Sequence, residues 1–304
     1  MNFERILFDM IDNAVPILFC VLGGNFAYKV NVLNISMEGM LLMGAFSSVL
    51  FLMLSGSMLV GILGAVCIVL VSGWIFSFMS ITRKGNPIIS GLAINLLATS
   101  ITAFVLKSLS LPNINVNHIV DVAGLKVNIP LLQDIPVIGS IVSGHSPLTY
   151  IAFVMIFVSW LLMYRTKFGV YVRVVGENEE ATESVGIRGT KIKYIAVLIG
   201  ALSCAFAGIN LAVERLALFT NDMSAGIGFI AIAAIFCGKG RPSITALYAM
   251  LFGLCQSLSV NLNISAGPAS GLFKTLPYIM IVTILAAVSI IQTRKNYTRG
   301  FKNE

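Results

Sequence analysis

Charged residues are scarce in this chain of 304 residues. Asp, Glu, Lys and Arg make up only 11% of it, whereas 57% of the residues are hydrophobic and the mean hydropathy is +0.93. This composition leaves too little polar surface to cover a water-soluble globule of this length, so soluble and fibrous proteins are excluded. Several apolar runs reach the roughly 20 residues that a helix needs to cross a bilayer. We therefore expect an all-α integral membrane protein in which residues 1–304 form a single transmembrane domain.

The sequence also lacks the motifs of soluble enzymes. It contains no GxxxxGKS/T, HExxH or GxSxG pattern, and the segment 238–240 lacks the upstream glycine and the following Ser or Thr of a phosphate-binding loop. We expect neither catalytic residues nor a cofactor. If the protein uses energy, another polypeptide must bind the nucleotide.

Paired cysteines and clustered histidines are absent as well. The five cysteines lie singly inside apolar segments, which predicts small residues that face the core or the lipid. His118 and His145 fall in one loop and are expected at the surface, so no metal site is predicted. The net charge of +7 comes without the aromatic-interleaved basic patch of a nucleic-acid-binding protein.

Apolar runs and the polar residues between them predict eight or nine crossings. The predicted spans are 8–28, 37–54, 58–80, 87–106, 147–164, 194–213, 226–238, 243–260 and 275–291. The run 226–238 is too short for a standard span, and the turn at 31–36 could lie at membrane depth. Irregular backbone is tolerated there only where protein buries it or where it lines a wet cavity. We therefore expect a discontinuous or re-entrant element.

Lys and Arg are distributed unevenly between the predicted loops. If the loop 165–193 faces the cytoplasm, alternation of the spans brings roughly three quarters of the positive charge to that side, as the positive-inside rule requires. Nine crossings then place the N-terminus outside and the C-terminus inside. The acidic start of the first run argues against a cleaved leader.

The loop 108–146 becomes external in this topology. Its short apolar pieces, 129–132 and 135–142, could lie along the membrane interface, cover the outer end of the bundle or simply close it. Glu214, Arg215 and Asp222 follow the sixth span on the same side. We expect them to be solvated, with contact to a docked external protein as the alternative.

The loop 165–193 contains the pattern of a short helix. Asn178 can accept hydrogen bonds from the amides of a first turn, Glu179 and Glu180 suit the positive end of a helix dipole, and Gly186 supplies a C-terminal stop. From these features alone, a solvated connector held by local charge pairs is the alternative.

Glu38 is an ionisable residue close to a predicted span, which makes it a functional candidate by default. A plainer role is structural. Asn34 or Ser36 would cap the second helix, and Glu38 would lie in its first turn, beside the positive end of the helix dipole.

Three uncharged polar residues are predicted inside spans. Asn95, Asn210 and Gln256 are expected to face the bundle or a wet path, because an unpartnered amide that faces lipid is costly. Hydrogen bonding between helices explains each of them equally well.

Segments along nearly the whole chain resemble one family of membrane proteins. Glu180-Ala181-Thr182 followed by Gly186 is similar to the EAA motif of bacterial ABC importer permeases, with Thr182 in place of the second Ala. The segment 34–44, NISMEGMLLMG, resembles the NIGxEG segment of the branched-chain amino acid, ribose and nucleoside permease family, particularly its nucleoside and simple-sugar members. Further similar segments follow in the same order at 135–139, 165–178, 222–234, 238–239 and 276–278.

The resemblance implies a multi-pass permease subunit of an ATP-binding-cassette importer in the bacterial inner membrane. The implied partners are a cytoplasmic ABC ATPase, a second homologous permease and an external substrate-binding lipoprotein. The implied substrate is a nucleoside, ribose or a simple sugar. The loop 165–193 would carry the coupling helix, 177–187, which docks into the ATPase. The coupling residues would be Gly176, Glu177, Asn178, Glu180, Ala181 and Gly186.

A self-sufficient channel or secondary carrier for a small polar solute is the alternative. Such a protein would need charged relays inside the membrane, and apart from Glu38 the predicted spans contain none deep inside them. If the turn before the second helix lies at mid-membrane, the N-terminus of that helix could also present amides to a substrate. The candidate residues of the translocation path are Asn34, Glu38, Asn95, Asn210 and Gln256.

Overall fold

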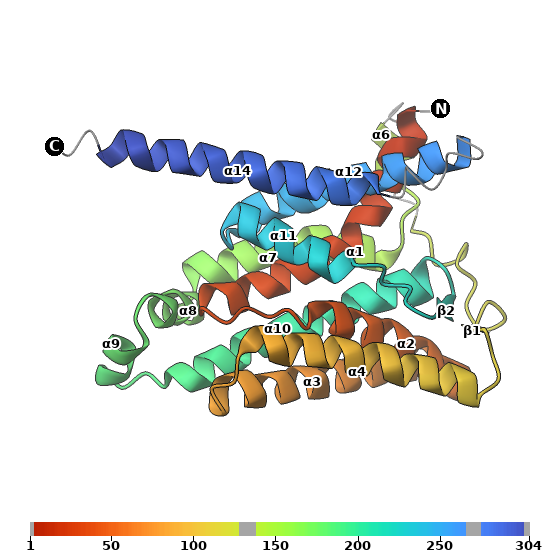
Figure 1. Cartoon of the computed structure of the whole chain (residues 1–304). Coiled ribbons are helices and arrows are strands. Elements are labelled where there is room, and N and C mark those ends of the chain that lie inside the picture. Colours follow the sequence, from red (N-terminus) through yellow and green to blue (C-terminus); the bar gives the residue numbers. More distant parts are fainter. Residues whose placement is uncertain (1–2, 128–137, 266–274, 301–304) are drawn as a thin grey trace.

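The computed structural model describes residues 3–127, 138–265 and 275–300 and is helical over most of them (Figure 1). The long helices are α1 (Phe3–Lys29), α2 (Met37–Ser55), α3 (Met58–Ser77), α4 (Pro87–Ser108), α7 (Pro147–Arg165), α10 (Gly189–Ile209), α12 (Pro242–Ser265) and α14 (Leu276–Gly300). The shorter helices are α6 (Ile138–Val142), α8 (Lys167–Glu177), α9 (Glu179–Ser184) and α11 (Ile227–Gly238). Two π-helical turns, η1 (Phe78–Thr82) and η2 (Asn210–Glu214), extend α3 and α10.

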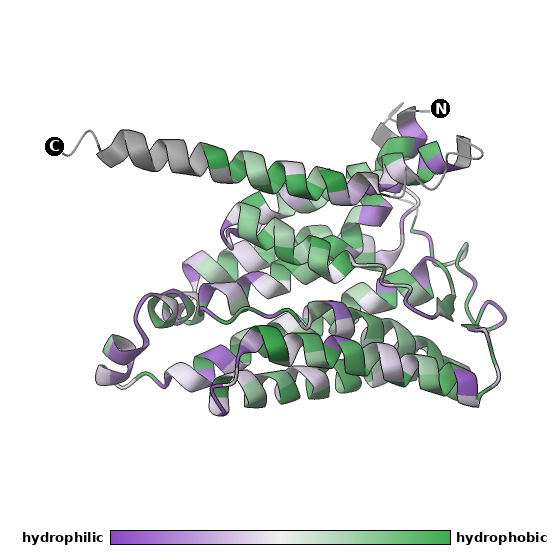
Figure 2. Ribbon diagram, in the orientation of Figure 1, coloured by the Kyte–Doolittle hydropathy of each residue, from purple (hydrophilic) through white to green (hydrophobic). Residues whose placement is uncertain are grey.

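Seven helices of the described chain are long and apolar enough to cross a membrane. They are Glu4–Lys29, Met37–Ser55, Met58–Thr82, Pro87–Ser108, Pro147–Arg165, Gly189–Glu214 and Pro242–Asn263. Seven of the nine predicted spans coincide with them, whereas the runs 226–238 and 275–291 correspond to the shorter apolar helices Ile227–Gly238 and Pro277–Val288. Hydrophilic residues gather at the two ends of the bundle, and hydrophobic residues fill the helices between (Figure 2).

The helices α1, α2 and α10 form the centre of the bundle. α1 packs against α10 and α12, and α2 packs against α3 and α10. Between 67% and 72% of the most apolar stretch of each central helix is buried, compared with 28–33% in α3, α4 and α7. Large side chains such as Leu96, Phe104 and Phe157 remain exposed on the outer helices. Apolar faces of this extent need lipid or another protein to cover them.

A small two-stranded sheet lies at the end of the bundle that also carries the N-terminus, and we call this the sheet end (Figure 1). Strand β1 (Asn113–Asn115) pairs antiparallel with β2 (Leu218–Thr220), with Ile114 opposite Phe219. The all-α prediction missed this sheet because three-residue strands show too little of the two-residue hydrophobic alternation. The opposite end carries α8 and α9, and we call it the α9 end.

The described parts of the loop 108–146 pack onto the bundle. Ile114, Val116 and Val120 are buried, and α6 packs against α1. The apolar piece 129–132 and the start of the piece 135–142 lie outside the described residues.

His145 corrects one expectation about this loop. Its side chain is buried, with Nδ1 2.6 Å from Oδ1 of Asp12 and Nε2 2.8 Å from the carbonyl oxygen of Ile141. The ring also stacks on Phe8, with a centroid distance of 4.0 Å. The prediction of a surface position is wrong because the loop folds back onto α1, whereas His118 is exposed as expected.

Candidate functional site

The chain between α1 and α2 is irregular but buried. Asn31 has a positive φ of 63°, and the amide of Val32 donates to the carbonyl of Ala27. Asn34 is 4% exposed, and its Oδ1 accepts from the amide of Ser36 at 3.1 Å. The predicted irregular turn therefore exists, and protein atoms accept from the amides of Val32 and Ser36, as buried backbone inside a membrane protein requires.

The N-terminus of α2 is capped by a residue of another helix. Oδ1 of Asn95, on α4, accepts from the amide of Gly39 at 2.8 Å, and Nδ2 donates to the carbonyl of Ile35 at 3.0 Å. A Cβ on Gly39 would lie 2.8 Å from Cα of Asn95, so the glycine permits this approach. The prediction that Asn34 or Ser36 caps α2 is wrong, because neither side chain bonds to an amide in its first turn.

We expect Asn95→Ala to lower the free energy of unfolding by about 1–2 kcal/mol, because it leaves a buried amide and a buried carbonyl without partners. The midpoint of thermal unfolding in detergent measures this loss. Ser100→Ala, on the exposed side of the same helix, is the control and should unfold like the wild type. An unchanged midpoint in Asn95→Ala would show that water or a rearranged side chain replaces the cap.

Glu38 binds the start of α11. Its Oε1 accepts from Oγ of Ser224 at 2.6 Å and from the amide of Gly226 at 2.9 Å, and its Oε2 accepts from the amide of Gly228 at 2.6 Å. Glu38 is 8% exposed. It lies in the first turn of α2, as predicted, but its carboxylate caps a different helix. Charge-assisted bonds and the dipole of α11 stabilise this buried carboxylate, and no cation of the described residues forms an ion pair with it.

Two glycines let the starts of α2 and α11 meet. A Cβ on Gly228 would lie 2.5 Å from Cα of Glu38, and Gly226 has a φ of 82°, which favours glycine. The amides of Gly39, Gly226 and Gly228 are therefore occupied by protein side chains and are not available to a substrate. We call this arrangement of Asn34, Ser36, Glu38, Gly39, Asn95, Ser224, Gly226 and Gly228 the helix-end junction.

Asn210 lies in a second polar cluster, near the sheet end. Its Nδ2 donates to Oγ of Ser146 at 3.1 Å and to Oε2 of Glu214 at 2.9 Å, and Oε1 of Glu214 accepts from the amide of Leu148 at 3.3 Å. These bonds join η2 to the start of α7. Their geometry supports helix pairing as the role of Asn210.

Glu214 is 4% exposed, so the prediction that it is solvated is wrong. Its position four residues after Asn210 places both side chains on the same side of the π-helical turn, against α7. Arg215 is half-buried and donates to Oδ1 of Asn13 at 3.0 Å, whereas Asp222 is exposed as expected.

Three buried amide oxygens have no hydrogen-bond partner within the described residues. They belong to Asn25, Asn210 and Gln256. Asn25, whose Nδ2 donates to Oγ1 of Thr245 at 2.8 Å, is not among the residues predicted from the sequence. Asn25 lies inside the predicted span 8–28, so it could have been recognised by the same rule as the other amides inside spans.

The structure brings three of the five candidates for the translocation path together. Asn34, Glu38 and Asn95 meet at the helix-end junction, whereas Asn210 faces α7 and Gln256 is half-buried on α12. The cavity beside Asn34 measures about 10 Å³. That is barely enough for one water molecule, so this cavity cannot hold a substrate.

The helix α9 lies at the end of the bundle opposite the two-stranded sheet (Figure 1). Oδ1 of Asn178 accepts from the amide of Ala181 at 3.0 Å, and Gly186, with a φ of 83°, follows the last turn. The amides of Gly186 and Ile187 donate back to the carbonyls of Glu183 and Thr182. The predicted cap and glycine stop of this short helix are confirmed.

One side of α9 is buried and the other is free. Thr182 is fully buried, and its Oγ1 donates to the carbonyl of Asn178 at 2.6 Å. Glu179 pairs with Lys193, with 2.6 Å between Oε2 and Nζ. The exposed residues are Glu177, Asn178, Glu180, Ala181, Glu183, Ser184, Val185 and Gly186. Thr182, where the family pattern has Ala, therefore faces the interior of this chain.

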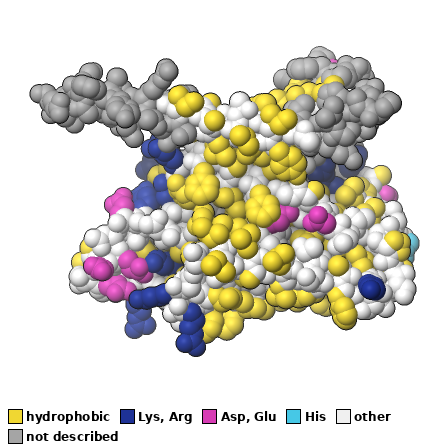
Figure 3. All heavy atoms as spheres, in the orientation of Figure 1, with side chains coloured by type: hydrophobic (Ala, Val, Ile, Leu, Met, Phe, Trp, Pro, Cys, Tyr) yellow, Lys and Arg dark blue, Asp and Glu magenta, His cyan; other side chains and the backbone are white. Residues whose placement is uncertain are grey.

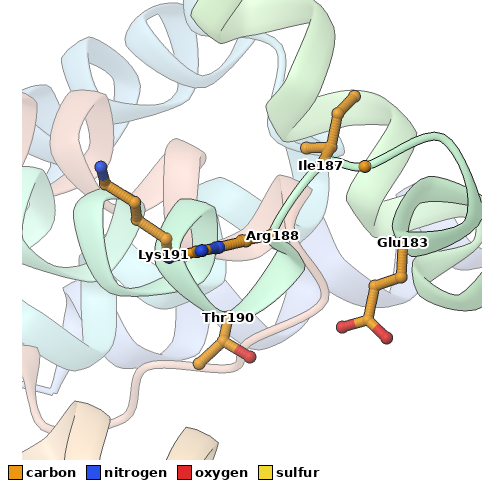
Figure 4. A pocket seen from close by; sticks show the side chains of 6 residues that line it. Glu183, Ile187, Arg188, Thr190 and Lys191 are labelled. Atoms are coloured by element: carbon orange, nitrogen blue, oxygen red, sulfur yellow. The ribbon is translucent and has the colours of Figure 1, made fainter.

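Two hollows flank α9. The first measures about 510 Å³ and is shown in Figure 4. It is lined by Glu183, Gly186, Ile187, Arg188, Thr190 and Lys191. The second, of about 630 Å³, lies between α9, the turn at 31–32 and the segment from the end of η1 to the start of α4. Gly176 takes no part in either hollow: a Cβ there would lie 1.8 Å from the carbonyl oxygen of Lys29, so this glycine packs α8 against α1.

Comparison with known proteins extends over almost the whole chain. Residues 6–285 match the family described as branched-chain amino acid transport system / permease component. The guanosine ABC transporter permease protein NupQ of Bacillus subtilis (strain 168) is 35% identical over 292 residues, which cover 91% of this chain and 89% of the relative. The nucleoside ABC transporter permease protein NupC of Lactococcus lactis subsp. cremoris (strain MG1363) is 30% identical over 93% of this chain and 92% of the relative.

A more distant relative matches only part of the chain. The ribose import permease protein RbsC of Escherichia coli (strain K12) is 32% identical over 108 residues, or 33% of each chain. No solved structure matches. The family match, the relatives that align along nearly the full length and the seven apolar helices agree with one another. This multi-pass protein of the cytoplasmic membrane therefore belongs to the permease component family of the branched-chain amino acid transport system.

Proposed function

We propose that this permease subunit of an ABC transporter carries a nucleoside into the cytoplasm, with ribose or another simple sugar as the second candidate substrate. One observation supports a nucleoside over ribose. The guanosine and nucleoside permeases align with 91% and 93% of this chain, whereas the ribose permease aligns with 33%.

The proposed topology has nine crossings, with the N-terminus outside and the α9 end in the cytoplasm. In this topology α11 makes a short crossing, and α14 is the last one. Lys and Arg side chains gather at the α9 end (Figure 3), which supports a cytoplasmic position for it. The hydrophobic residues that predominate between the two ends of the bundle agree with this arrangement (Figure 2).

The exposed side of α9 is the proposed docking surface for a separate ATPase. It carries two carboxylates, Glu180 and Glu183, and Val185, which is 72% exposed. An exposed apolar side chain between charged ones suits a protein contact more than a solvated loop. The cap at Asn178 and the ion pair between Glu179 and Lys193 hold α9 firmly, so that a rigid-body movement of the ATPase can reach α10.

The translocation path is proposed to form between this chain and a second, homologous permease. The cavity beside Asn34 is too small for a nucleoside, which supports a path that two chains build together. An external binding lipoprotein would deliver the substrate at the sheet end. Alternating access then comes from the two permeases rocking about their interface as the ATPase closes.

The proposal predicts ATP-dependent uptake of radiolabelled guanosine by proteoliposomes that contain this chain, the second permease, the ATPase and the binding protein. Unlabelled ribose should compete poorly. Liposomes with this chain alone should show no uptake. ATP-independent uptake by the single chain would instead support a channel or secondary carrier, and preferential ribose uptake would overturn the substrate assignment.

A further inference from the structure

An aromatic groove runs along the outer surface of α7. It has a volume of about 430 Å³ and is lined by Phe153, Ile156, Phe157 and Trp160 of α7 and by Ser243 of α12. Phe157 is 62% exposed, and its ring stacks on that of Trp160 with a centroid distance of 6.0 Å. Since α7 is one of the outer helices with an exposed apolar face, lipid chains can reach this groove.

Basic side chains surround the end of the groove nearest α9. The guanidinium of Arg165 lies 5.8 Å from the ring centre of Trp160, and that of Arg173 lies 5.3 Å from the ring centre of Tyr164. The rings of Trp160 and Tyr164 are themselves 6.4 Å apart. Arg241 precedes the groove residue Ser243 by two positions and is exposed.

Lys29, at the end of α1, is a fourth cation and lies beside the segments that carry Arg173 and Arg241: a Cβ on Gly240 would lie 3.2 Å from its Cε, and a Cβ on Gly176 would lie 1.8 Å from its carbonyl oxygen. It interacts electrostatically with both Arg173 and Arg241, and Glu177 is the one acidic residue that acts on it. Within residues 3–127, 138–265 and 275–300, Lys29, Arg165, Arg173 and Arg241 form no ion pair. A group of cations without matching carboxylates is unfavourable unless an anion joins it.

We propose that this site binds an anionic phospholipid, with its phosphate among Lys29, Arg165, Arg173 and Arg241 and one acyl chain in the aromatic groove. A phospholipid joins a negative head to an apolar tail, and it therefore satisfies both halves of the site at once. Basic pockets between transmembrane helices are known to hold such head groups, and aromatic rings are enriched at the same depth. A soluble anion would fill only the basic half.

The bound lipid would hold α8 in place. Arg173 lies on α8, Lys29 ends α1, and Arg241 immediately precedes α12. The helix α8 leads directly into α9. A phosphate shared by these cations would join three elements that carry like charge. The inference needs only the membrane location of the chain and does not depend on its substrate or on ATPase docking.

The test measures how the purified protein in detergent responds to phosphatidylglycerol and to zwitterionic phosphatidylcholine. Phosphatidylglycerol should raise the midpoint of thermal unfolding, whereas phosphatidylcholine should not. In Arg173→Gln/Arg241→Gln the affinity for phosphatidylglycerol should fall about 25-fold, since each cation contributes about fivefold. The matched control, Lys107→Gln/Lys126→Gln, removes two exposed charges near the sheet end and should bind like the wild type.

Three results would overturn the proposal. The first is a midpoint of thermal unfolding that phosphatidylcholine raises as much as phosphatidylglycerol does. The second is an affinity for phosphatidylglycerol that is the same in Arg173→Gln/Arg241→Gln as in the control double variant. The third is a midpoint of thermal unfolding that inorganic phosphate raises as much as phosphatidylglycerol does, which would indicate a site for a free anion. Phe157→Ala tests the groove separately, because no described cation lies over the Phe157 ring: it should weaken the binding of a long-chain phosphatidylglycerol and leave that of inorganic phosphate unchanged.

Discussion

Replacing Glu38 by Gln should abolish uptake while leaving the protein in the membrane. The carboxylate accepts three hydrogen bonds from the segment 224–228, and the NH₂ group of Gln would face at least one of those donors. Hydrogen bonds to a charged group contribute about 1.5–3 kcal/mol, and a lost helix-dipole contact adds to this. We therefore expect the start of α11 to detach from α2.

Uptake and hydrogen exchange of the amides of Gly226 and Gly228 measure the effect together. Exchange should rise in Glu38→Gln as uptake falls. Glu38→Asp keeps the charge on a shorter side chain. Its uptake and amide exchange should lie between those of Glu38→Gln and the wild type. Asp222→Asn removes an exposed carboxylate and is the matched control for the change in charge. Normal uptake in Glu38→Gln, with faster exchange, would show that the cap has no part in transport.

Gly186→Asp should abolish uptake without preventing membrane insertion. The φ of 83° at Gly186 is strained for any residue with a Cβ, by about 1–2 kcal/mol. Because a Cβ there would meet nothing within 4 Å, the effect comes from the backbone and not from a clash. We expect the C-terminal end of α9 to change direction. The exposed side of α9 should then no longer bind the ATPase.

Gly56 offers a matched control for this substitution. It follows α2 with a φ of 68°, and a Cβ there would also meet nothing within 4 Å. Gly56→Asp should therefore cost about as much stability as Gly186→Asp and leave uptake intact. If both variants lose uptake equally, the loss reflects stability alone and the coupling assignment fails.

Glu180→Lys tests the same surface by charge. Glu180 is exposed on α9, so reversal of its charge should leave the fold unchanged and disrupt the contact with the ATPase. Uptake and the amount of ATPase that co-purifies should both fall. Asp121→Lys makes the same charge reversal at an exposed position near the sheet end. It should change neither uptake nor the amount of ATPase that co-purifies. Wild-type uptake in Glu180→Lys would show that Glu180 is not part of the docking surface.

The helix α9 shows how far local sequence rules reach. Asn178, which caps the helix, and Gly186, which ends it, act on groups within four residues of themselves, so their roles follow from spacing. The same rules do not say which side of the helix is buried. The full burial of Thr182 depends on how α9 packs against its neighbours.

The helix-end junction shows the opposite case. Glu38 binds groups 186 to 190 residues away in the sequence, and Asn95 binds an amide 56 residues away. His145 likewise meets Asp12 across 133 positions. A polar residue in an apolar chain is recognisable as one that needs a partner. Its partner follows only from the packing of distant helices.

The sequence by itself determined the membrane location, most of the spans, the irregular turn before α2 and the ends of α9. These features depend on composition and on contacts within a few residues. Only the tertiary structure decided that Asn95 caps α2, that Glu38 caps α11 and that Glu214 and His145 are buried. The physical reason is that a buried polar group must be satisfied within the protein, and the closest available partner is set by which helices the apolar packing brings together.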